Sequence, residues 1–128
     1  MRLLLDTHAL IWWFLGDERL PLRARKIMNS NDAEVFVSAV SAYEIALKHR
    51  LGKLPAGGLL LTDFRRLIAA QSFLPLAVSI EHALAAGALD VAHRDPFDRL
   101  LVAQSIVEGM RLVSNEMLLD KLGAARLW

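Results

Sequence analysis

The 128-residue sequence contains no cysteine. Disulfide bonds are therefore excluded, and so is any metal site built from thiolates. The absence fits a protein of the reducing cytoplasm, and we expect the chain to work there.

The sequence also lacks a long hydrophobic run. The longest uncharged stretches, such as 9–16 and 54–62, are too short or too interrupted by glycine to span a bilayer. The first residues, MRLLLDTH, place an acid after three leucines and show no secretory cleavage pattern. We therefore expect no membrane partner.

Neither sign of charge dominates the chain. The 15 basic and 14 acidic residues give a formal net charge of +1. This balance excludes the global basic field of a bulk nucleic-acid binder, so a nucleic-acid partner would have to meet a local basic patch.

Apolar residues are abundant, at 55% of the chain, which indicates elements buried on more than one face. The length favours a single domain, residues 1–128, without internal repeats. Short apolar runs predict strands at 2–5, 35–37, 74–78, 111–113 and 125–127. Helical patterns alternate with them at 7–15, 21–28, about 38–51, 59–73, 79–87, 96–108 and 115–122. The alternation predicts an α/β fold, a three-layer α/β/α sandwich with a central parallel sheet of four to five strands.

Three acids are expected at the sheet edge where ligands of parallel α/β folds bind. Asp6 follows the first strand, Glu116 follows the strand at 111–113, and Asp98 lies in the first turn of a helix. Each could instead stabilise a helix start, because acids favour N-caps and first turns.

The segment HRDPFDRLLVAQ (93–104) presents the same choice for two aspartates. Asp95 suits an N-cap, Pro96 suits the first helical position and Asp98 the third, so helix-start rules alone explain all three. The local pattern does not decide between a cap and a catalytic carboxylate.

Glu44 lies four residues after Val40 on an apolar stripe predicted for the helix near 38–51. The other members of that stripe are Tyr43, Leu47 and Leu51. The Glu44 carboxylate either belongs to a site or turns aside to pair with Lys48 in the favourable i, i+4 order. A surface pair contributes only about 0.3–0.5 kcal/mol, whereas burying an unpaired charge costs several-fold more, so both interpretations stay open.

Several carboxylates converging on one edge would repel one another and be driven to protonate unless a cation held them. Acid-only ligation without cysteine points to Mg²⁺, with Mn²⁺ as the alternative. The four histidines show no paired metal-binding spacing, and we expect each to be a capping or surface residue. An acidic pocket without a Gly-rich phosphate loop favours metal-assisted attack of water on a phosphodiester, with an acid outside the metal as general base.

Four motifs extend over nearly the whole chain: LLLDTHALIWW (3–13), VSAVSAYEIALKHRLGKL (37–54), HRDPFDRLLVAQ (93–104) and RLVSNE (111–116). In order and spacing they resemble those of the PIN-domain ribonuclease toxins of bacterial type II toxin–antitoxin modules, the VapC family. The resemblance implies a catalytic site of four acids, Asp6, Glu44, Asp98 and Glu116, with the metal held by Asp6 and Asp98.

The resemblance also implies supporting roles around these acids. Thr7 and Ser114 match hydroxyls that orient acids or water, and we expect Asp95 to support the pocket as the helix cap. Glu116 departs from the pattern, because the family usually has aspartate there.

The family further implies Mg²⁺-dependent endonucleolytic cleavage of RNA, a homodimer or toxin–antitoxin hetero-oligomer, and a cognate antitoxin that inserts a segment into the active-site groove. At least one of Trp12, Trp13 and Phe14 is a candidate for such an interface, with core packing as the alternative. The candidate RNA-binding residues are Lys48, Arg50, Lys53, Arg94 and Arg99, although an ordinary solvated surface explains each as well.

Two alternatives belong to other functional classes. A catalytically silent PIN-fold module could bind RNA or regulate a partner, and the Glu116 departure favours it. A phosphoacceptor receiver domain shares the alternating architecture, but LLLDTH and RLVSNE supply neither the acid pair nor the lysine that it needs.

Overall fold

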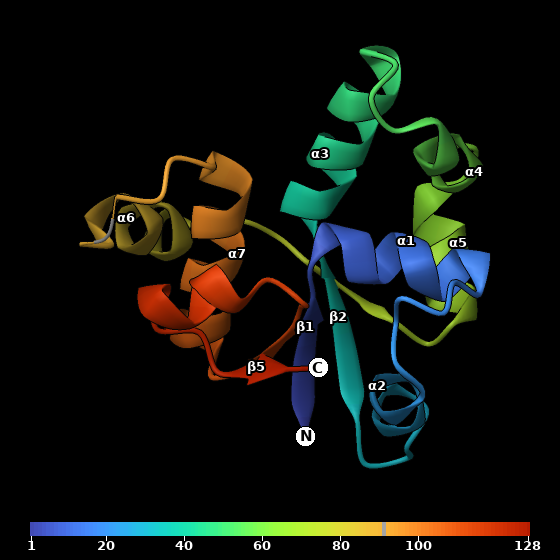
Figure 1. The fold of residues 1–128 in the computed structure, drawn as a ribbon, viewed down its shortest axis with the longest axis horizontal. Coiled ribbons are helices and arrows are strands. Elements are labelled where there is room, and N and C mark those ends of the chain that lie inside the picture. Colours follow the sequence, from blue (N-terminus) through green and yellow to red (C-terminus); the bar gives the residue numbers. More distant parts are fainter. Residues whose placement is uncertain (91) are drawn as a thin grey trace.

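A computed structural model describes residues 1–90 and 92–128 and shows a five-stranded parallel sheet between two layers of helices (Figure 1). The strands are β1 (Arg2–Leu5), β2 (Glu34–Ser38), β3 (Leu74–Leu76), β4 (Arg111–Val113) and β5 (Arg126–Leu127). Their spatial order is β3-β2-β1-β4-β5, and every neighbouring pair is parallel. The predicted sandwich is confirmed.

The central strand is β1, which pairs with β2 on one side and with β4 on the other. In this register Leu4 lies opposite both Phe36 and Leu112. The side chains of Leu3, Leu4 and Leu5 are fully buried, because helices cover both faces of the sheet. A continuous apolar run at the N-terminus is the sequence signature of this position.

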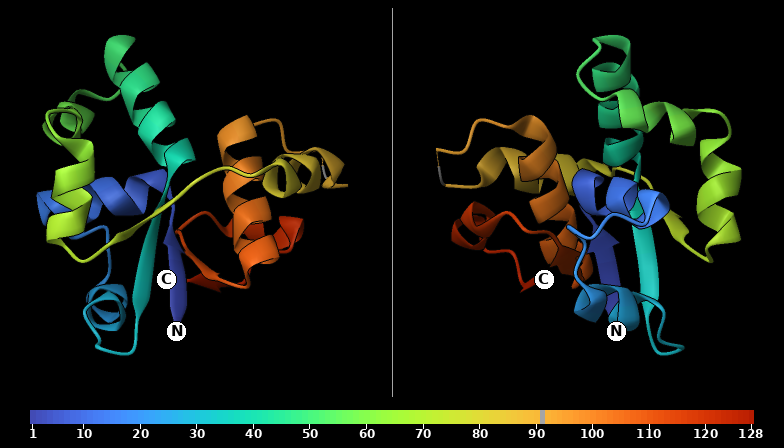
Figure 2. Two further views of the ribbon diagram at one scale, coloured as in Figure 1. Left: turned by 180° about the vertical axis from the view of Figure 1, so that it is seen from behind. Right: turned by 45° about the vertical axis from the view of Figure 1, so that its right-hand side comes forward.

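Alternate side chains of β1 enter different cores. Leu3 and Leu5 pack in the core that includes α1 (Thr7–Leu15), α2 (Leu22–Met28) and α5 (Phe64–Ala70). Leu4 packs in the opposite core with α7 (Pro96–Glu108) and the 3₁₀ segment η2 (Met117–Leu122). The helix α6 (Ile80–Ala88) lies against α7 on the side away from the sheet (Figure 2).

The helix α3 (Ala39–Arg50) leaves the carboxyl end of β2 and rises beyond the sheet, followed by the 3₁₀ segment η1 (Pro55–Gly57) and α4 (Gly58–Leu61). It faces the first turn of α7 across the same end of the sheet (Figure 1). β1 ends on the same side and is followed by α1, so α1, α3 and α7 approach one another at this end of the sheet.

The expected boundaries were wrong in the middle of the chain and near its end. The stretch 59–73 was predicted as one helical segment, but it divides into α4 and α5, because Asp63 adopts a non-helical backbone with φ −159° and ψ 70°. The strand expected at 74–78 ends at Leu76, and the helix expected at 115–122 is the 3₁₀ segment Met117–Leu122.

The aromatic cluster of α1 packs mainly into the protein. Trp12 is 7% exposed and its ring lies 5.8 Å from that of Trp128, while Trp13 and Phe14 are half-buried against the same core. Core packing therefore explains these rings better than the interface expected for one of them. Within residues 1–90 and 92–128, no helix has the length and apolarity needed to cross a membrane.

A buried polar link joins the start of α3, α7 and the segment between β3 and α6. Ser38, the N-cap of α3, donates from Oγ to Gln104 Oε1 at 2.6 Å, and Gln104 Nε2 donates to the Ala77 carbonyl at 3.2 Å. Gln104 is fully buried. Its amide therefore fixes the spacing between α7 and the start of α3.

Replacing Gln104 with leucine should lower the free energy of unfolding by about 1–3 kcal/mol, because the Ser38 hydroxyl and the Ala77 carbonyl lose a buried partner. Urea denaturation followed by circular dichroism measures the change. Asn31→Leu, at an exposed position, is the control and should alter stability by less than about 0.5 kcal/mol. Equal stability of the Gln104→Leu variant and the unaltered protein would contradict this role.

Candidate active site

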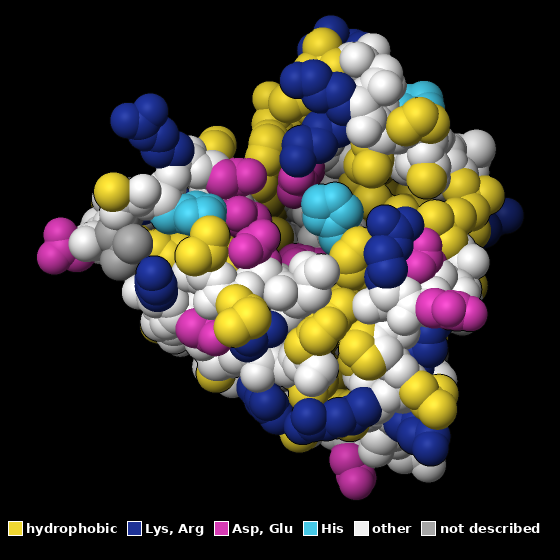
Figure 3. All heavy atoms as spheres, viewed as in Figure 1, with side chains coloured by type: hydrophobic (Ala, Val, Ile, Leu, Met, Phe, Trp, Pro, Cys, Tyr) yellow, Lys and Arg dark blue, Asp and Glu magenta, His cyan; other side chains and the backbone are white. Residues whose placement is uncertain are grey.

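Four acidic side chains that the sequence places far apart line one pocket at the carboxyl end of the sheet. They are Asp6 after β1, Glu44 in α3, Asp98 in the first turn of α7, and Glu116 after β4. The pocket has a volume of about 150 Å³, and its remaining walls are Thr7, His8, Lys48, Asp95 and Asn115. Figure 3 shows acidic side chains gathered in the hollow between α7 and α3, with basic side chains over α3.

Asp6, which directly follows β1, is buried, with 8% of its surface exposed. As the N-cap of α1 it accepts a hydrogen bond from the Ala9 N–H at 2.7 Å. Burial raises the pKa of Asp6 to about 6; the charge of Asp98 adds to the increase, while hydrogen bonds from Ser114 and Ala9 oppose it. The expected cap is present, and the same carboxylate also faces the pocket.

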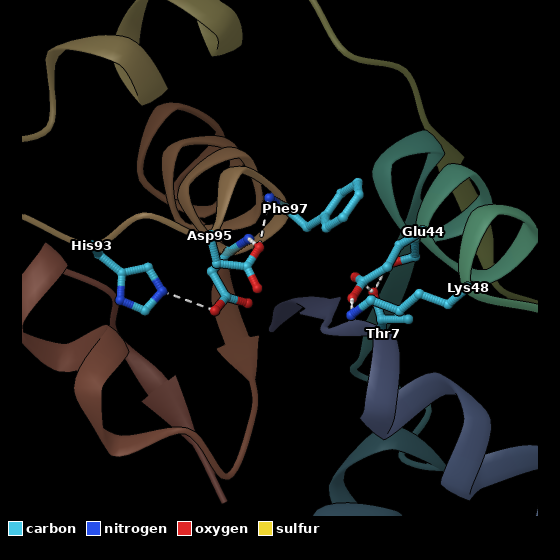
Figure 4. A network of polar contacts seen from close by, with 8 residues as sticks. Thr7, Glu44, Lys48, His93, Asp95 and Phe97 are labelled. Carbon is cyan, nitrogen blue, oxygen red and sulfur yellow. Dashed lines mark hydrogen bonds and ion pairs between the residues drawn. The ribbon is translucent and has the colours of Figure 1, made fainter. Parts of the chain in front are cut away.

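Glu44 satisfies both interpretations left open by the sequence. Its side chain is 5% exposed, forms an ion pair with Lys48 and accepts a hydrogen bond from Thr7 Oγ1 at 2.6 Å (Figure 4). Ser41 Oγ lies 3.1 Å from the same Thr7 hydroxyl. Lys48 and Thr7 thereby hold the buried carboxylate in one orientation against α1.

The apolar stripe predicted for α3 was partly wrong. Tyr43 is 63% exposed and Leu51 is 49% exposed, whereas the buried face comprises Val40, Ser41, Glu44 and Ile45. The buried face of α3 is therefore narrower than the predicted stripe, and it includes polar residues.

The two aspartates of the DPFD segment have different positions. Asp95 is the N-cap of α7, where its Oδ1 accepts hydrogen bonds from the N–H groups of Phe97 at 2.9 Å and Asp98 at 3.2 Å. Asp98 lines the pocket, and His93 Nε2 lies 2.9 Å from its Oδ2. Burial raises the pKa of Asp98, the charges of Asp95 and Glu44 add to the increase, and the contact with His93 opposes it.

Glu116 lies at the exposed rim of the pocket. Its backbone N–H donates to the Ser114 hydroxyl at 3.0 Å, and Ser114 is fully buried and also bonds Asp6. Ser114 therefore joins the ends of β4 and β1. The structure brings Glu116 to the site but with less burial than Asp6 or Glu44.

The expected basic residues separate into two groups. Lys48 forms part of the pocket wall, and Arg50, Lys53 and Arg94 are exposed. Arg99 instead donates to the carbonyls of Ala86, Leu89 and His93, so its guanidinium ties α6 to the loop before α7. We replace the RNA-binding role expected for Arg99 with this structural one.

Sequence reasoning missed His8 and Asn115 as pocket residues, and it missed the contact between His93 and Asp98. The histidines were expected to be caps or surface residues, which holds for His82, the third residue of the α6 capping box, but not for His93. No spacing rule connects His93 with Asp98, because an irregular loop brings them together. The sequence offered only a weak indication of Asn115, namely its position two residues after the end of β4, next to Ser114.

Comparison with known proteins identifies the family. Residues 3–124 match the PIN domain model, and the chain is 30% identical over 114 residues to Ribonuclease VapC22 of Mycobacterium tuberculosis. That alignment covers 88% of this chain and 85% of the relative. The chain belongs to the PIN-domain family, in its VapC group.

A solved structure has the same fold as this PIN domain. A chain in the crystal structure of VapBC2 from Rickettsia felis, bound to a DNA fragment from its promoter, superposes with a TM-score of 0.71. The comparison covers 100% of this chain and 98% of that chain at 12% sequence identity. At that identity the similarity establishes the fold.

The donor set of the PIN-domain pocket fits a hard divalent cation. Burial raises the pKa of both Asp6 and Asp98, and the charge of Asp98 raises that of Asp6 further; a bound cation would stabilise the ionised carboxylates. Among the described residues, no group of three or more acids or histidines is arranged to enclose a metal ion unaided. Two carboxylates with water completing the shell suit Mg²⁺, which usually retains several waters.

Changing Asp6 to asparagine should stabilise the metal-free PIN domain at neutral pH. A carboxyl whose folded-state pKa is raised from 3.8 to about 6 contributes stability below its ordinary pKa and loses it as pH rises through 6. Asparagine keeps the N-cap without the buried charge, so the expected gain is about 2–3 kcal/mol at about pH 7.5 and close to nothing at about pH 3.5.

Urea denaturation of both proteins in chelator at the two pH values measures this difference. Asp63→Asn, at the exposed start of α5, is the control and should change stability by less than about 0.5 kcal/mol at either pH. An Asp6→Asn variant that is less stable than the unaltered protein at neutral pH would refute the burial argument.

Proposed function

We propose that this VapC-group protein is a Mg²⁺-dependent endoribonuclease that acts as the toxin of a type II toxin–antitoxin module. The observation that carries the proposal is the Asp6–Asp98 pair, two carboxylates whose pKa values are raised by burial in a polar pocket at the carboxyl end of a parallel sheet. Such a pair is costly to keep ionised without a cation, and its position is where α/β folds bind substrates.

Asp6 and Asp98 would hold the metal, with Mn²⁺ as the alternative ion. Bound there, Mg²⁺ would supply charge neutralisation at the phosphodiester and an activated water. Glu44, fixed by Thr7 and Lys48 and outside the metal pair, is placed to take the proton of the attacking water. Glu116 at the rim would hold a further water, while Asp95 and Ser114 keep Asp98 and Asp6 in position.

RNA is the substrate class that the surroundings and the relatives support. The curated relative is a ribonuclease by name. Lys48 lines the pocket, and Arg50 and Lys53 at and after the end of α3, with Arg94 in the loop before α7, add exposed positive charge on the flanking elements. Basic side chains beside an acidic pocket can hold the flanking phosphates while the scissile one meets the metal.

The proposed partner is a cognate antitoxin, in a toxin homodimer or a toxin–antitoxin hetero-oligomer. The resemblance of the four motifs to VapC toxins supports it, and so does the shared fold with a chain from a VapBC2 structure. We further propose that residues 1–128 form one domain and that the protein acts in the cytoplasm, where its RNA substrates would be.

The rival function is a catalytically silent PIN-fold module that binds RNA or regulates a partner. The observation in its favour is the replacement of the usual aspartate by Glu116, whose side chain lies at the exposed rim. The convergence of the other three acids favours the enzyme.

Purified protein free of antitoxin should cleave structured and single-stranded RNAs in Mg²⁺ and not in excess chelator. Asp98→Asn should reduce the rate by at least about 100-fold, the lower range for loss of one group that acts in the transition state. Gel analysis of end-labelled RNA measures both effects. Asp63→Asn, which changes an exposed acid outside the pocket, should cleave at the unaltered rate.

Cleavage that persists in chelator or in the Asp98→Asn protein would rule out the metal mechanism. Binding of RNA without cleavage of any substrate would favour the silent module. Growth arrest on expression, relieved by Asp98→Asn, would support the toxin assignment in cells.

A further inference from the structure

An apolar pocket adjoins the acidic one across the gap between α3 and α7. It has a volume of about 370 Å³, within the range of small-ligand sites. Its walls are Ala39, Val40, Tyr43, Val78, Pro96, Phe97 and Leu100. The pocket contains no acidic or basic side chain, in contrast to its neighbour.

Consecutive residues of the two helices face the two pockets. On α3, Tyr43 lines the apolar pocket and Glu44 lines the acidic one; on α7, Phe97 lines the apolar pocket and Asp98 the acidic one. The two pockets are therefore neighbours, an apolar half and an acidic half of the region between α3 and α7.

Two aromatic rings stand at the boundary between these halves. The rings of Tyr43 and Phe97 lie 5.8 Å apart, and Lys48 Nζ lies 5.7 Å from the centroid of Phe97. Tyr43 is 63% exposed, so most of its ring is available to a ligand. Accessible aromatic area next to a candidate active site indicates a binding surface.

A nucleotide chain matches this arrangement in its spacing and its chemistry. When one phosphate of a single strand occupies the acidic pocket, the base next to that phosphate is close enough to enter the adjoining apolar pocket. Such a base has a flat apolar face. Aromatic side chains stack on such faces whatever the base, and a cation beside the rings, here Lys48, suits the adjoining phosphate.

We propose that Tyr43 and Phe97 form a stacking subsite for an unpaired base next to the scissile phosphate, and that this subsite sets which base is preferred there. The inference rests on the proposed function, because it places the phosphate at the Asp6–Asp98 pair. An apolar segment of a protein partner would fill the same pocket, but it would bring no negative group to pair with Lys48 at the boundary with the acids.

The test uses Tyr43→Ala, which removes an exposed ring and should leave folding intact. Cleavage of a randomised single-stranded RNA pool, with the product ends sequenced, reports rate and base preference together. We expect kcat/KM to fall between about 5- and 100-fold, the effect of losing one base–aromatic stack, and the preference at one position beside the cut to flatten. Tyr43→Phe should retain both, because it keeps the ring.

Leu84→Ala is the matched control, because Leu84 is a 70% exposed apolar side chain on α6 that lines neither pocket. It should cleave with unaltered rate and preference. A Tyr43→Ala protein that cleaves with the unaltered preference overturns the subsite while leaving the proposed function standing. Weaker antitoxin binding by that variant with unchanged cleavage would assign the pocket to the protein partner and also overturn the inference.

A binding measurement covers the case in which the protein does not cleave. Single-stranded RNA carrying 2-aminopurine, whose fluorescence falls on stacking, is titrated with the unaltered protein and with Tyr43→Ala. Quenching that requires the Tyr43 ring supports the subsite even if the proposed ribonuclease function fails. The same quenching by both proteins, or by neither, overturns the subsite.

Discussion

Burial of two carboxylates, Asp6 and Asp98, in one pocket connects the fold to the proposed chemistry, because it raises the pKa of both. The burial of Asp6 follows from the way β1 ends. Three buried leucines bring the chain through the middle of the sheet, and the next residue, Asp6, both caps α1 and faces the pocket. The Asp6 carboxylate thus lies at the end of β1, caps α1 and lines the pocket.

The acids of the pocket are neutralised in different ways. Glu44 has Lys48 as an ion-pair partner and Asp98 is in contact with a ring nitrogen of His93, whereas within residues 1–90 and 92–128 Asp6 receives hydrogen bonds from Ala9 and Ser114 but forms no ion pair. The charge of Asp6 is therefore the one that an external cation would stabilise most. The lysine already paired with Glu44 supports assigning that residue to proton transfer and not to the metal.

Local rules predicted the fold and brought Asp6, Asp98 and Glu116 to one edge of the sheet, whereas the set of four acids came from the resemblance to VapC toxins. Continuous apolar runs indicated buried parallel strands, and Asp6 and Glu116 followed strand ends that meet at one edge. The division of 59–73 into two helices depended on the backbone at Asp63, which the apolar spacing did not reveal. The exposure of Tyr43 depended on how little of α3 the neighbouring helices cover, a property of tertiary packing.

Long-range contacts of loop residues account for the remaining differences. The His93 contact with Asp98 and the inward position of Arg99 both arise from the path of the chain between α6 and α7, which no periodic pattern encodes. The same path separates Asp95 and Asp98, which helix-start rules treated alike. Only their contacts show that the first orients the helix and the second faces the pocket.

The pKa of Asp6 is the most direct test of the proposed metal site, because that site depends on a buried carboxylate without an ion-pair partner among the described residues. A carboxyl-carbon NMR titration of the metal-free protein, repeated in saturating Mg²⁺, measures it. The account predicts titration near pH 6 without metal and a clear decrease in the pKa of Asp6 when Mg²⁺ is present. An Asp6 carboxyl that titrates near its ordinary pKa of 3.8, with no response to Mg²⁺, would contradict it.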